Sequence, residues 1–515
     1  MKSATRKLLA ILLCIAVASS LFACKPKAKP DAPGTDAQAP VKDTLNISVS
    51  QDNGTLNALG ITGGFIGVSF CYQEPLLDMD SDMEVVWRLA TGWDKVSDTQ
   101  YTLHLREGVT FSNGNPFTAD DVIFSLKLYF DDPGHSFYVD PIDLENTAKI
   151  DDHTVDLRYT SYSAASVPKL TMVQMFDEES YDETALSTRP IGTGAYVVTE
   201  YIVNNHVTMK ARDDYWEGVP KIKTLVFKVL NEASQIVNSL DNGTVDVATV
   251  PAEDLDYVKT LTSYNINQTP ANLCDALFFN MMPNSVFSSK EARYAVMHAI
   301  NRDTILNLVY HGLATATALP VSMFSVDLED RFLNLNETYS VGYDLELAKR
   351  YAEAAGLSGQ TVVLVTNGAA QYITMAEIIQ ASLLDIGVTV KVQNYDMASY
   401  WTVTEDPTMF DMSLYCTAAP SLMIADVIPT TFLWSDPGWR GADFDRFMEL
   451  GGEVLSIPDA KERGDVLYEI VQLFVDAAPW YGICDTYGAT AYKTDLAGVK
   501  ATALGYYHYS DWSFT

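Results

Sequence analysis

Residue types that could do chemistry occur in this sequence, but they rarely stand at the spacing that chemistry needs. The seven histidines never fall at metal-ligand spacing, although a metal site built from distant histidines stays open. The sequence has no HExxH, no G-x-S-x-G and no Walker-type phosphate motif. Paired acids such as Asp120–Asp121 are adjacent, so we interpret them as helix caps or solvated faces rather than as a general acid and base. We therefore expect a protein that is not an enzyme and that holds no metal or cofactor.

One short segment looks like a fragment of a phosphate-binding loop. Gly192-Thr193-Gly194 has two of the glycines of such a loop, but neither a third glycine at the right spacing nor a Gly-Lys pair follows. We expect a tight turn between strands here rather than a nucleotide site.

The cysteines divide into two groups. Cys14 and Cys24 lie near the N-terminus, whereas Cys71, Cys274, Cys416 and Cys484 are spaced far apart in the body of the chain. No CxxC motif occurs, which argues against zinc or thioredoxin-type chemistry. Four cysteines allow three full pairings, and an exported chain would permit disulfides.

The N-terminal residues predict export and lipid anchoring. Lys2, Arg6 and Lys7 precede an apolar run from 8 to 21, which is short for a membrane span but typical of a signal peptide. The run ends in Leu21-Phe22-Ala23-Cys24, which resembles the bacterial lipobox; an ordinary secretory signal with a chance cysteine is the alternative. We expect a signal peptide over 1–23, a lipid on Cys24 and a proline-rich disordered tether over 24–43. The protein would then be held at the outer face of the bacterial cytoplasmic membrane.

The length of the chain indicates several domains, and its charge argues against some classes of partner. Removal of residues 1–23 leaves a chain too long for one hydrophobic core, so we expect two or more domains. The net charge of −33 repels the phosphates of nucleic acids and anionic lipids, so we expect no nucleic-acid partner.

The pattern of apolar residues predicts alternating strands and helices. Thr118 and Asp121 are placed to cap a helix, Ser289 opens another that runs through Ala299, and Asp344 begins a third that Gly356 stops. The alternation favours an α/β fold with a partly parallel sheet. The clearest remaining predictions are strands at 45–49, 101–105, 225–230, 245–249, 361–366 and 388–393, and helices at 232–240 and 372–386.

Several motifs together resemble one known family. The chain is similar to the dipeptide, oligopeptide and nickel class (family 5) of the solute-binding proteins of ABC transporters, over about residues 45 to 515. The resemblance rests on blocks in the family's order: YQEPLLD (72–78), LATGW (89–93), YTLHLREGVTF (101–111), NGNPFTADDV (113–122), PIGTGAY (190–196), DYW (214–216), LDNGTVD (240–246), EARYAV with AINR (291–302), and Tyr343-Asp344 with Ala348-Lys349.

The resemblance implies a fold, a function and partners. It implies an α/β, periplasmic-binding-protein-like fold in which two lobes with a hinge, plus an additional domain, close over a ligand. Domain I would comprise 44–80, 190–275 and 495–515, domain II 81–189, and domain III 276–494. The protein would act as a monomer that captures a peptide-like or other small organic solute and delivers it to a membrane permease. A ligand-sensing receptor on the same fold is one alternative, and an exported hydrolase on an unrecognised scaffold is another.

The resemblance also implies ligand-binding residues. Trp401 and Tyr487 resemble pocket aromatics of oligopeptide binders, and Tyr415-Cys416-Thr417-Ala418 occupies the segment that meets ligand backbone. Tyr72 is a further expected ligand contact. Five more are expected from loop position alone: Asn53, Thr249, Asn272, Asn367 and Tyr372. Cys274 and Cys416 lie near two positions that some oligopeptide binders join, so we expect a disulfide between them.

One departure from the family bears on the ligand. Peptide binders usually carry an aspartate shortly after this segment to pair with the α-ammonium group, because an unpaired buried charge is costly. Here no acid follows until Asp426. We therefore hypothesise a ligand that lacks a free amine, unless Asp426 or another part of the protein supplies the charge.

Overall fold

The computed structural model describes residues 42–61, 65–319, 321–418, 421–427 and 438–515. The predicted signal peptide, Cys24 and nearly all of the predicted tether lie outside the described residues. From Lys42 to Thr515 the chain forms one compact unit.

The largest sheet of this unit has eleven strands. Its order is β15-β14-β16-β12-β17-β11-β1-β10-β9-β8, and β13 pairs with β17 beside this path. Strand β1 is parallel to β10 and β11, and β14 is parallel to β15 and β16, so the partly parallel sheet is confirmed. The strands are β1 (Thr44–Val49), β8 (Tyr196–Ile202), β9 (His206–Ala211), β10 (Thr224–Val229), β11 (Val247–Thr249), β12 (Tyr264–Phe279), β13 (Ala314–Ala316), β14 (Thr361–Thr366), β15 (Thr389–Asn394), β16 (Met412–Thr417) and β17 (Trp480–Lys493).

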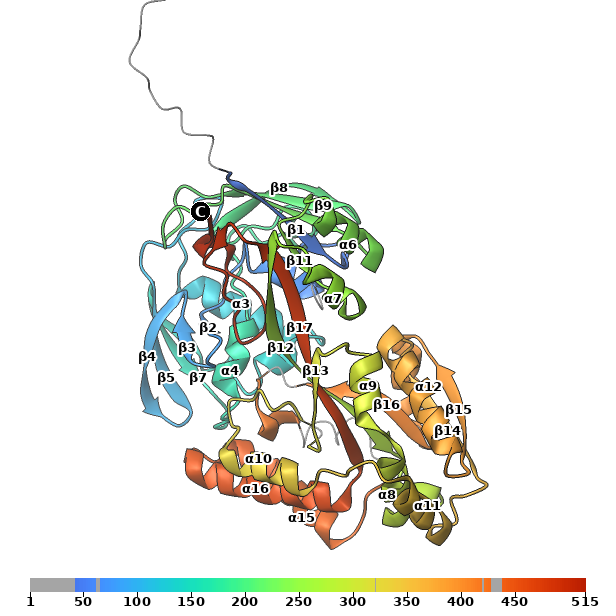
Figure 1. The fold of residues 1–515 in the computed structure, drawn as a ribbon. Coiled ribbons are helices and arrows are strands. Elements are labelled where there is room, and N and C mark those ends of the chain that lie inside the picture. Colours follow the sequence, from blue (N-terminus) through green and yellow to red (C-terminus); the bar gives the residue numbers. More distant parts are fainter. Residues whose placement is uncertain (1–41, 62–64, 320, 419–420, 428–437) are drawn as a thin grey trace, which may run out of the picture. The chain divides into compact units, whose positions relative to one another are not determined.

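Two long strands carry the sheet from one lobe to the other. β12 and β17 pair antiparallel along most of their length and run side by side through the middle of the fold (Figure 1). Their register shifts between Pro270 and Cys274, where Asn272 adopts a left-handed backbone with φ of 54°. Residues 264–270 pair with the part of β17 that continues to β11 and β1, and residues 274–278 lie between β16 and β17. This irregularity is where the paired strands can bend.

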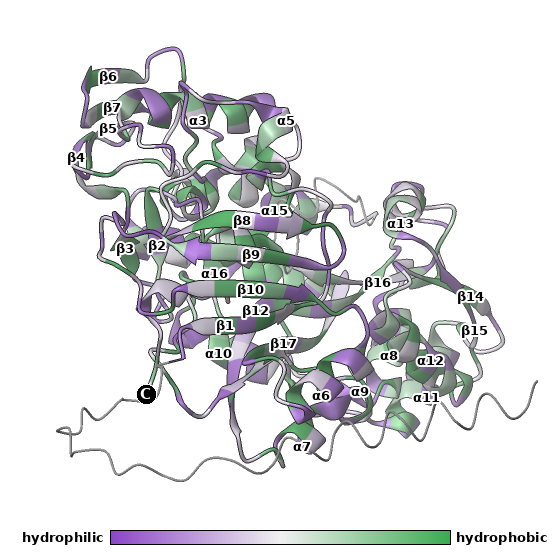
Figure 2. Ribbon diagram, turned by 90° about the horizontal axis from the view of Figure 1, so that it is seen from above, coloured by the Kyte–Doolittle hydropathy of each residue, from purple (hydrophilic) through white to green (hydrophobic). Residues whose placement is uncertain are grey.

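Helices complete both lobes. α8, α11 and α12 lie beside β14 and β15 (Figure 2), and their apolar faces pack into the largest hydrophobic core, which spans residues 277 to 484. The helices are α2 (Ile66–Ser69), α3 (Ala119–Asp131), α4 (Ser166–Lys169), α5 (Glu183–Leu186), α6 (Ala233–Asp241), α7 (Leu255–Val258), α8 (Lys290–Ala299), α9 (Arg302–Leu308), α10 (Asp330–Thr338), α11 (Leu345–Ala354), α12 (Ala370–Leu384), α13 (Met397–Thr404), α15 (Ala442–Glu453) and α16 (Ala460–Ala477).

A separate antiparallel sheet of order β4-β5-β7-β6 packs with α3 around its own core, most of which lies between residues 76 and 186. Two further cores hold the segments around β1 and β11. The remaining strands are β2 (Leu77–Met79), β3 (Val85–Trp87), β4 (Ala90–Ser97), β5 (Gln100–Leu105), β6 (Ala148–Asp151), β7 (Thr154–Arg158), β18 (Leu496–Ala497) and β19 (Ser513–Phe514).

The predicted helix starts are confirmed by their caps. The Asp121 carboxylate accepts the Thr118 backbone N–H at 2.8 Å, the Ser289 hydroxyl accepts that of Ala292 at 3.2 Å, and Asp344 accepts that of Leu347 at 2.9 Å. The strand at 361–366 is confirmed at both ends. The helix predicted at 372–386 begins and ends two residues earlier, and its N-cap residue, Ala369, makes no side-chain cap hydrogen bond.

Gly192 and Gly194 belong to a close approach of two backbones. A β-carbon on Gly194 would lie 2.6 Å from the Cys71 carbonyl oxygen, and one on Gly192 would overlap the carbonyl of Tyr72. Arg212 donates to the carbonyl oxygens of Gly192 and Thr193 from the other side. The segment is a bend that leads into β8, so its glycines serve backbone packing.

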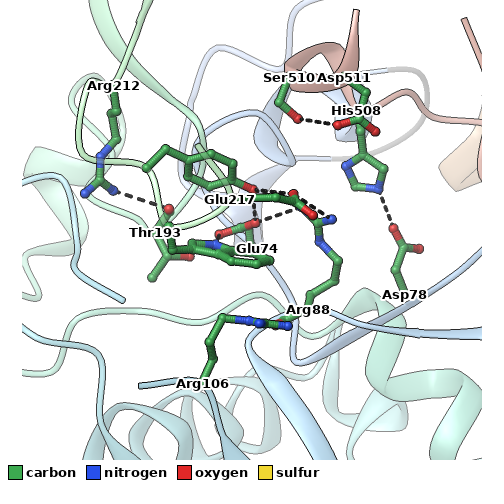
Figure 3. A network of polar contacts seen from close by, with 12 residues as sticks. Glu74, Asp78, Arg88, Arg106, Thr193, Arg212, Glu217, His508, Ser510 and Asp511 are labelled. Carbon is green, nitrogen blue, oxygen red and sulfur yellow. Dashed lines mark hydrogen bonds and ion pairs between the residues drawn. The ribbon is translucent and has the colours of Figure 1, made fainter. Parts of the chain in front are cut away.

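A buried polar network lies where the segment 74–88 meets residues 215–217 (Figure 3). The Arg88 guanidinium pairs with Glu74 at 3.0 Å and with Glu217 at 3.2 Å. The Tyr215 hydroxyl and the Trp216 indole N–H also donate to the Glu74 carboxylate, at 2.7 and 3.0 Å. Since both oxygens of this buried acid are satisfied, the network ties two parts of the chain that lie far apart in sequence.

Candidate functional site

The main candidate cavity lies against the two long strands and is lined from both lobes. Its volume is about 620 Å³. β12 and β17 form one wall, the end of β11 and the residues after it form a second, and α12 with the residues after α9 forms a third. The lining includes Thr249, Glu253, Leu273, Asp275, Tyr310, His311, Gln371, Tyr372, Thr486 and Tyr487. Three of the predicted ligand contacts, Thr249, Tyr372 and Tyr487, are thus brought to one cavity.

A buried carboxyl group lies in the wall of this cavity. Asp275 on β12 is 3% exposed, and its two oxygens accept the hydroxyls of Tyr372, at 2.7 Å, and of Tyr310. Burial raises the pKa of the Asp275 carboxyl, and the two tyrosine hydrogen bonds oppose that rise. Burial and the adjacent carboxylate raise the pKa of both tyrosines, so their hydroxyls stay protonated.

Two thiols flank the same carboxyl group. In the sheet, Asp275 lies opposite Cys416 of β16 on one side and opposite Cys484 of β17 on the other. The Cys416 thiol is within hydrogen-bonding reach of the Tyr372 hydroxyl, and the Cys484 thiol is within reach of the Tyr310 hydroxyl. Burial raises the pKa of Cys416 to about 12, so this thiol is protonated and unreactive at neutral pH.

A second, smaller cavity shares one lining residue, Thr249, with the first. Its volume is about 270 Å³, and no charged residue is among the described residues that line it. Apolar and aromatic side chains dominate the wall, including Ile47, Phe227 and Val247 from the sheet and Tyr506 and Tyr507 from the C-terminal segment. A solute that extended from the first cavity into the second would meet a largely apolar surface.

An aromatic group begins at Tyr372 and leads away from the main cavity. The Tyr415 ring lies 6.2 Å from that of Tyr372, 5.6 Å from that of Tyr400 and 5.0 Å from that of Trp401. Trp401 on α13 is 38% exposed, whereas Tyr400 is buried. The group offers an exposed aromatic face supported by buried rings.

Asn272, Thr417 and Ala418 meet elsewhere, in a small pocket with Phe324 and Leu422. The Asn272 side-chain amide donates to the Ala503 carbonyl oxygen at 2.6 Å, while its own oxygen is buried and finds no partner among the described residues. The left-handed backbone at the register shift of β12 turns this side chain toward the pocket.

Other predicted contacts lie outside both cavities. Tyr72 is 1% exposed in the core around β1, and its hydroxyl donates to the Leu56 carbonyl oxygen at 2.6 Å, so assigning it to the ligand was wrong. The Asn367 side chain accepts the Ala369 backbone N–H at 3.1 Å. Asn53 lies in the loop after β1 and lines neither cavity.

The sequence reasoning missed Asp275 and Tyr310. A signal for Asp275 was present, because it is the single acid in the apolar run Cys274–Phe279 of a buried strand. Tyr310 gave no signal in the sequence, since only the tertiary structure brings this residue, which follows α9, beside Asp275.

Asp426 has partners of its own. It is buried, it accepts the Ser421 hydroxyl at 2.7 Å, and it lies 3.6 Å from the ammonium group of Lys169 on α4. A carboxylate engaged in this way has less capacity left for a ligand ammonium group.

The expected disulfide between Cys274 and Cys416 is not formed, and the four cysteines of the described residues are all free. Cys274 lies opposite Thr417, whereas Cys416 lies opposite Asp275. Because consecutive side chains on a strand point to opposite faces, the two thiols project from different faces of the sheet. Cys71 and Cys484 belong to different hydrophobic cores.

Asp485 on β17 is a second buried carboxyl group on the long strands, and we expect its titration to make stability depend on pH. Burial raises the pKa of Asp485 to about 7. An unfolded aspartate titrates near ~3.9, so the native state binds more protons between about pH 4 and 7, and stability should fall as the pH rises through that window. We expect Asp485→Asn to reduce this fall in urea-unfolding midpoints measured at pH 5 and pH 8. Asp82→Asn, at an exposed loop position, should retain it; an unchanged pH dependence in Asp485→Asn would contradict the prediction.

The described residues contain neither a metal-binding group nor a helix that could span a membrane. No group of three or more His, Cys, Asp or Glu side chains among them is arranged to hold a metal ion. No helix among the residues that the structure describes is long and apolar enough to cross a membrane.

Comparison with known proteins identifies the fold and the family. Residues 84–430 match the family model of the bacterial extracellular solute-binding proteins, family 5 (middle region). "Heme-binding protein A" of Haemophilus influenzae is 24% identical over 465 residues, which cover 81% of this chain and 82% of that protein.

Solved structures share the α/β, periplasmic-binding-protein-like fold with its two lobes. Brucella suis NikA in complex with Fe(III)-EDTA superposes with a TM-score of 0.80 at 19% identity, covering 92% of this chain and all of that one. The Bacillus subtilis oligopeptide-binding protein AppA with a nonapeptide gives 0.74 at 19% identity, covering 92% and 99%. The family model spans well over half of the chain and the fold agrees with it, so this protein belongs to the family 5 bacterial extracellular solute-binding proteins.

Proposed function

We propose that this protein is the extracytoplasmic receptor of an ABC importer and captures one small organic or peptide-like solute in the 620 Å³ cavity. The observation that carries the proposal is the composition of the cavity wall, which combines residues of both lobes with the two strands that connect them. A ligand that contacts both lobes favours the closed form by its differential affinity, and a permease can recognise that form.

Several features of the proposal are inferred from the sequence. The mature protein would be tethered through a lipid on Cys24, would act as a monomer without catalytic activity, and would divide into the three domains described above. The separate hydrophobic cores of residues 76–186 and 277–484 support that division.

The experiment that tests the proposal is identification of the bound ligand. The protein is purified without denaturation, the ligand is released and identified by mass spectrometry, and rebinding is measured by calorimetry. Small-angle scattering with and without that ligand then reports closure. A reproducible ligand that binds at one site per chain and compacts the protein supports the proposal. Binding without compaction, or chemical turnover of the ligand, contradicts it.

Trp401 is expected to contribute contact area to the ligand. Replacing it with alanine removes a 38%-exposed ring that packs edge-on against Tyr415, and binding should weaken by about 1–3 kcal/mol. The measurement is calorimetric titration of Trp401→Ala with the ligand released from the wild-type protein. Trp401 lines neither cavity but belongs to the aromatic group that begins at the cavity residue Tyr372. Tyr343→Ala removes an exposed aromatic ring that is not part of this group and should bind normally. Equal affinities of the two variants would remove Trp401 from the site.

A further inference from the structure

The charged groups of the main cavity are of one sign. Asp275 and Glu253 contribute carboxyl groups, and His311 is the one basic side chain among the described residues that line it. Neither lysine nor arginine occurs in that lining, and the whole chain carries a net charge of −33. A solute anion would therefore enter a region of negative potential without a partner, and its desolvation would be uncompensated.

Asp275 differs in its partners from two other buried acids of the protein, Glu74 and Asp426. Glu74 pairs with Arg88, and Asp426 lies beside Lys169. Asp275, in contrast, is held by two neutral hydroxyls and has no basic partner among the described residues. A carboxylate that is buried in a cavity wall without a counter-ion attracts a cation strongly, because the surrounding dielectric is low.

The hydrogen-bonding groups of the cavity wall also favour a solute that donates hydrogen bonds. Each tyrosine hydroxyl has a single proton, and in Tyr310 and Tyr372 that proton is donated to Asp275. Any phenolic oxygen that meets a solute therefore does so as an acceptor. Each phenolic oxygen keeps lone-pair capacity for a donor from the solute.

We propose that the cavity selects a solute with a positively charged hydrogen-bond donor, an ammonium or guanidinium group, which Asp275 holds together with the hydroxyls of Tyr310 and Tyr372. The tyrosine rings add favourable contacts with a cation. The smaller, uncharged cavity that shares Thr249 with the main cavity takes the apolar part of the solute. This inference rests on the proposed function and replaces the amine-free ligand suggested by residues 417–423, because Asp275 supplies the carboxyl group that this segment lacks.

The test compares four forms of the dipeptide Ala-Phe: the amide, with a charge of +1; the N-acetyl amide, which is neutral; the zwitterion; and the N-acetyl acid, with a charge of −1. Binding to the full chain is measured by calorimetry, and the ligand released from purified protein is identified by mass spectrometry. We expect the released ligand to carry an amine or guanidine group. Among the probes, we expect affinity to fall in the order amide, N-acetyl amide, N-acetyl acid. An anionic released ligand, or an acid that binds as tightly as the amide, overturns the inference.

Variants test whether Asp275 and its tyrosine partners cause the preference for the charged amide. Asp275→Asn should lower affinity for the amide by about tenfold and leave the neutral form within about threefold, because only the charge-assisted contact is lost. Asp256→Asn removes the same charge from an exposed position of α7 and should change neither. If Asp275→Asn does not fold, Tyr372→Phe, which keeps the ring, should also reduce the preference for the amide.

Different results would overturn the preference for a cation and the proposed receptor function. Equal losses for the charged and neutral probes in Asp275→Asn, or an unchanged preference in Tyr372→Phe, overturn the inference alone. If no ligand is released and none of the four probes binds, the proposed function fails as well.

Discussion

Arg88→Met should destabilise the protein by about 3–5 kcal/mol, measured by urea unfolding at pH 7. Arg88 is 7% exposed and neutralises Glu74, which is 3% exposed. Methionine fills much of the same volume without the charge, so the loss arises from leaving the Glu74 carboxylate buried without its cation. The Tyr215 and Trp216 hydrogen bonds remain, but neutral donors compensate a buried charge only in part.

Two controls separate this explanation from a general effect of removing arginine. The double variant Arg88→Met with Glu74→Gln should recover part of the loss, because it removes the unpaired charge. Arg446→Met breaks exposed ion pairs with Glu449 and Glu469 and should have little effect. A double variant that is no more stable than Arg88→Met, or a similar loss in Arg446→Met, would show that the buried charge is not the cause.

Gly194→Ala should cost about 1–3 kcal/mol of stability through steric overlap. The new β-carbon would lie 2.6 Å from both the Cys71 carbonyl oxygen and the Tyr72 carbonyl carbon. These are backbone atoms of a buried segment, so they cannot rotate away as the end of a side chain could. Thermal unfolding followed by circular dichroism measures the effect.

Gly452 in α15 provides the matched control. A β-carbon there meets nothing within 4 Å, and alanine is the better helix former by up to about 1 kcal/mol. Gly452→Ala should therefore be neutral or stabilising. If both variants lost stability equally, the cause would be the backbone freedom of glycine and not the close approach of 192–194 to 71–72.

Much of the fold was predictable from the sequence because its signals are local. The strand at Thr361–Thr366 follows from a short, continuous apolar run, Val362–Val365, between two threonines. The helix starts at Thr118, Ser289 and Asp344 follow from side chains that bond to the backbone three residues away. Each of these depends on neighbours in the sequence, so reading the sequence suffices.

The site was predictable only in part. Tyr487, predicted from the family resemblance, and Thr249 and Tyr372, predicted from loop position, line the main cavity. In contrast, Tyr72 packs into a core, and Cys274 and Cys416 face opposite sides of the sheet. Position along the chain gives the neighbourhood of a residue, but the direction of its side chain depends on strand register. A shift of one residue between β12 and β16 was enough to separate the two thiols.

The sequence by itself determined that this chain has the helices, strands and motifs of a solute-binding protein and lacks recognisable catalytic motifs. Only the tertiary structure decided what chemistry faces the solute. Asp275 meets Tyr310 and Tyr372, which are 35 and 97 residues away along the chain and come from two different segments, the residues after α9 and helix α12. Such a cluster depends on long-range packing, which no local periodicity or cap records.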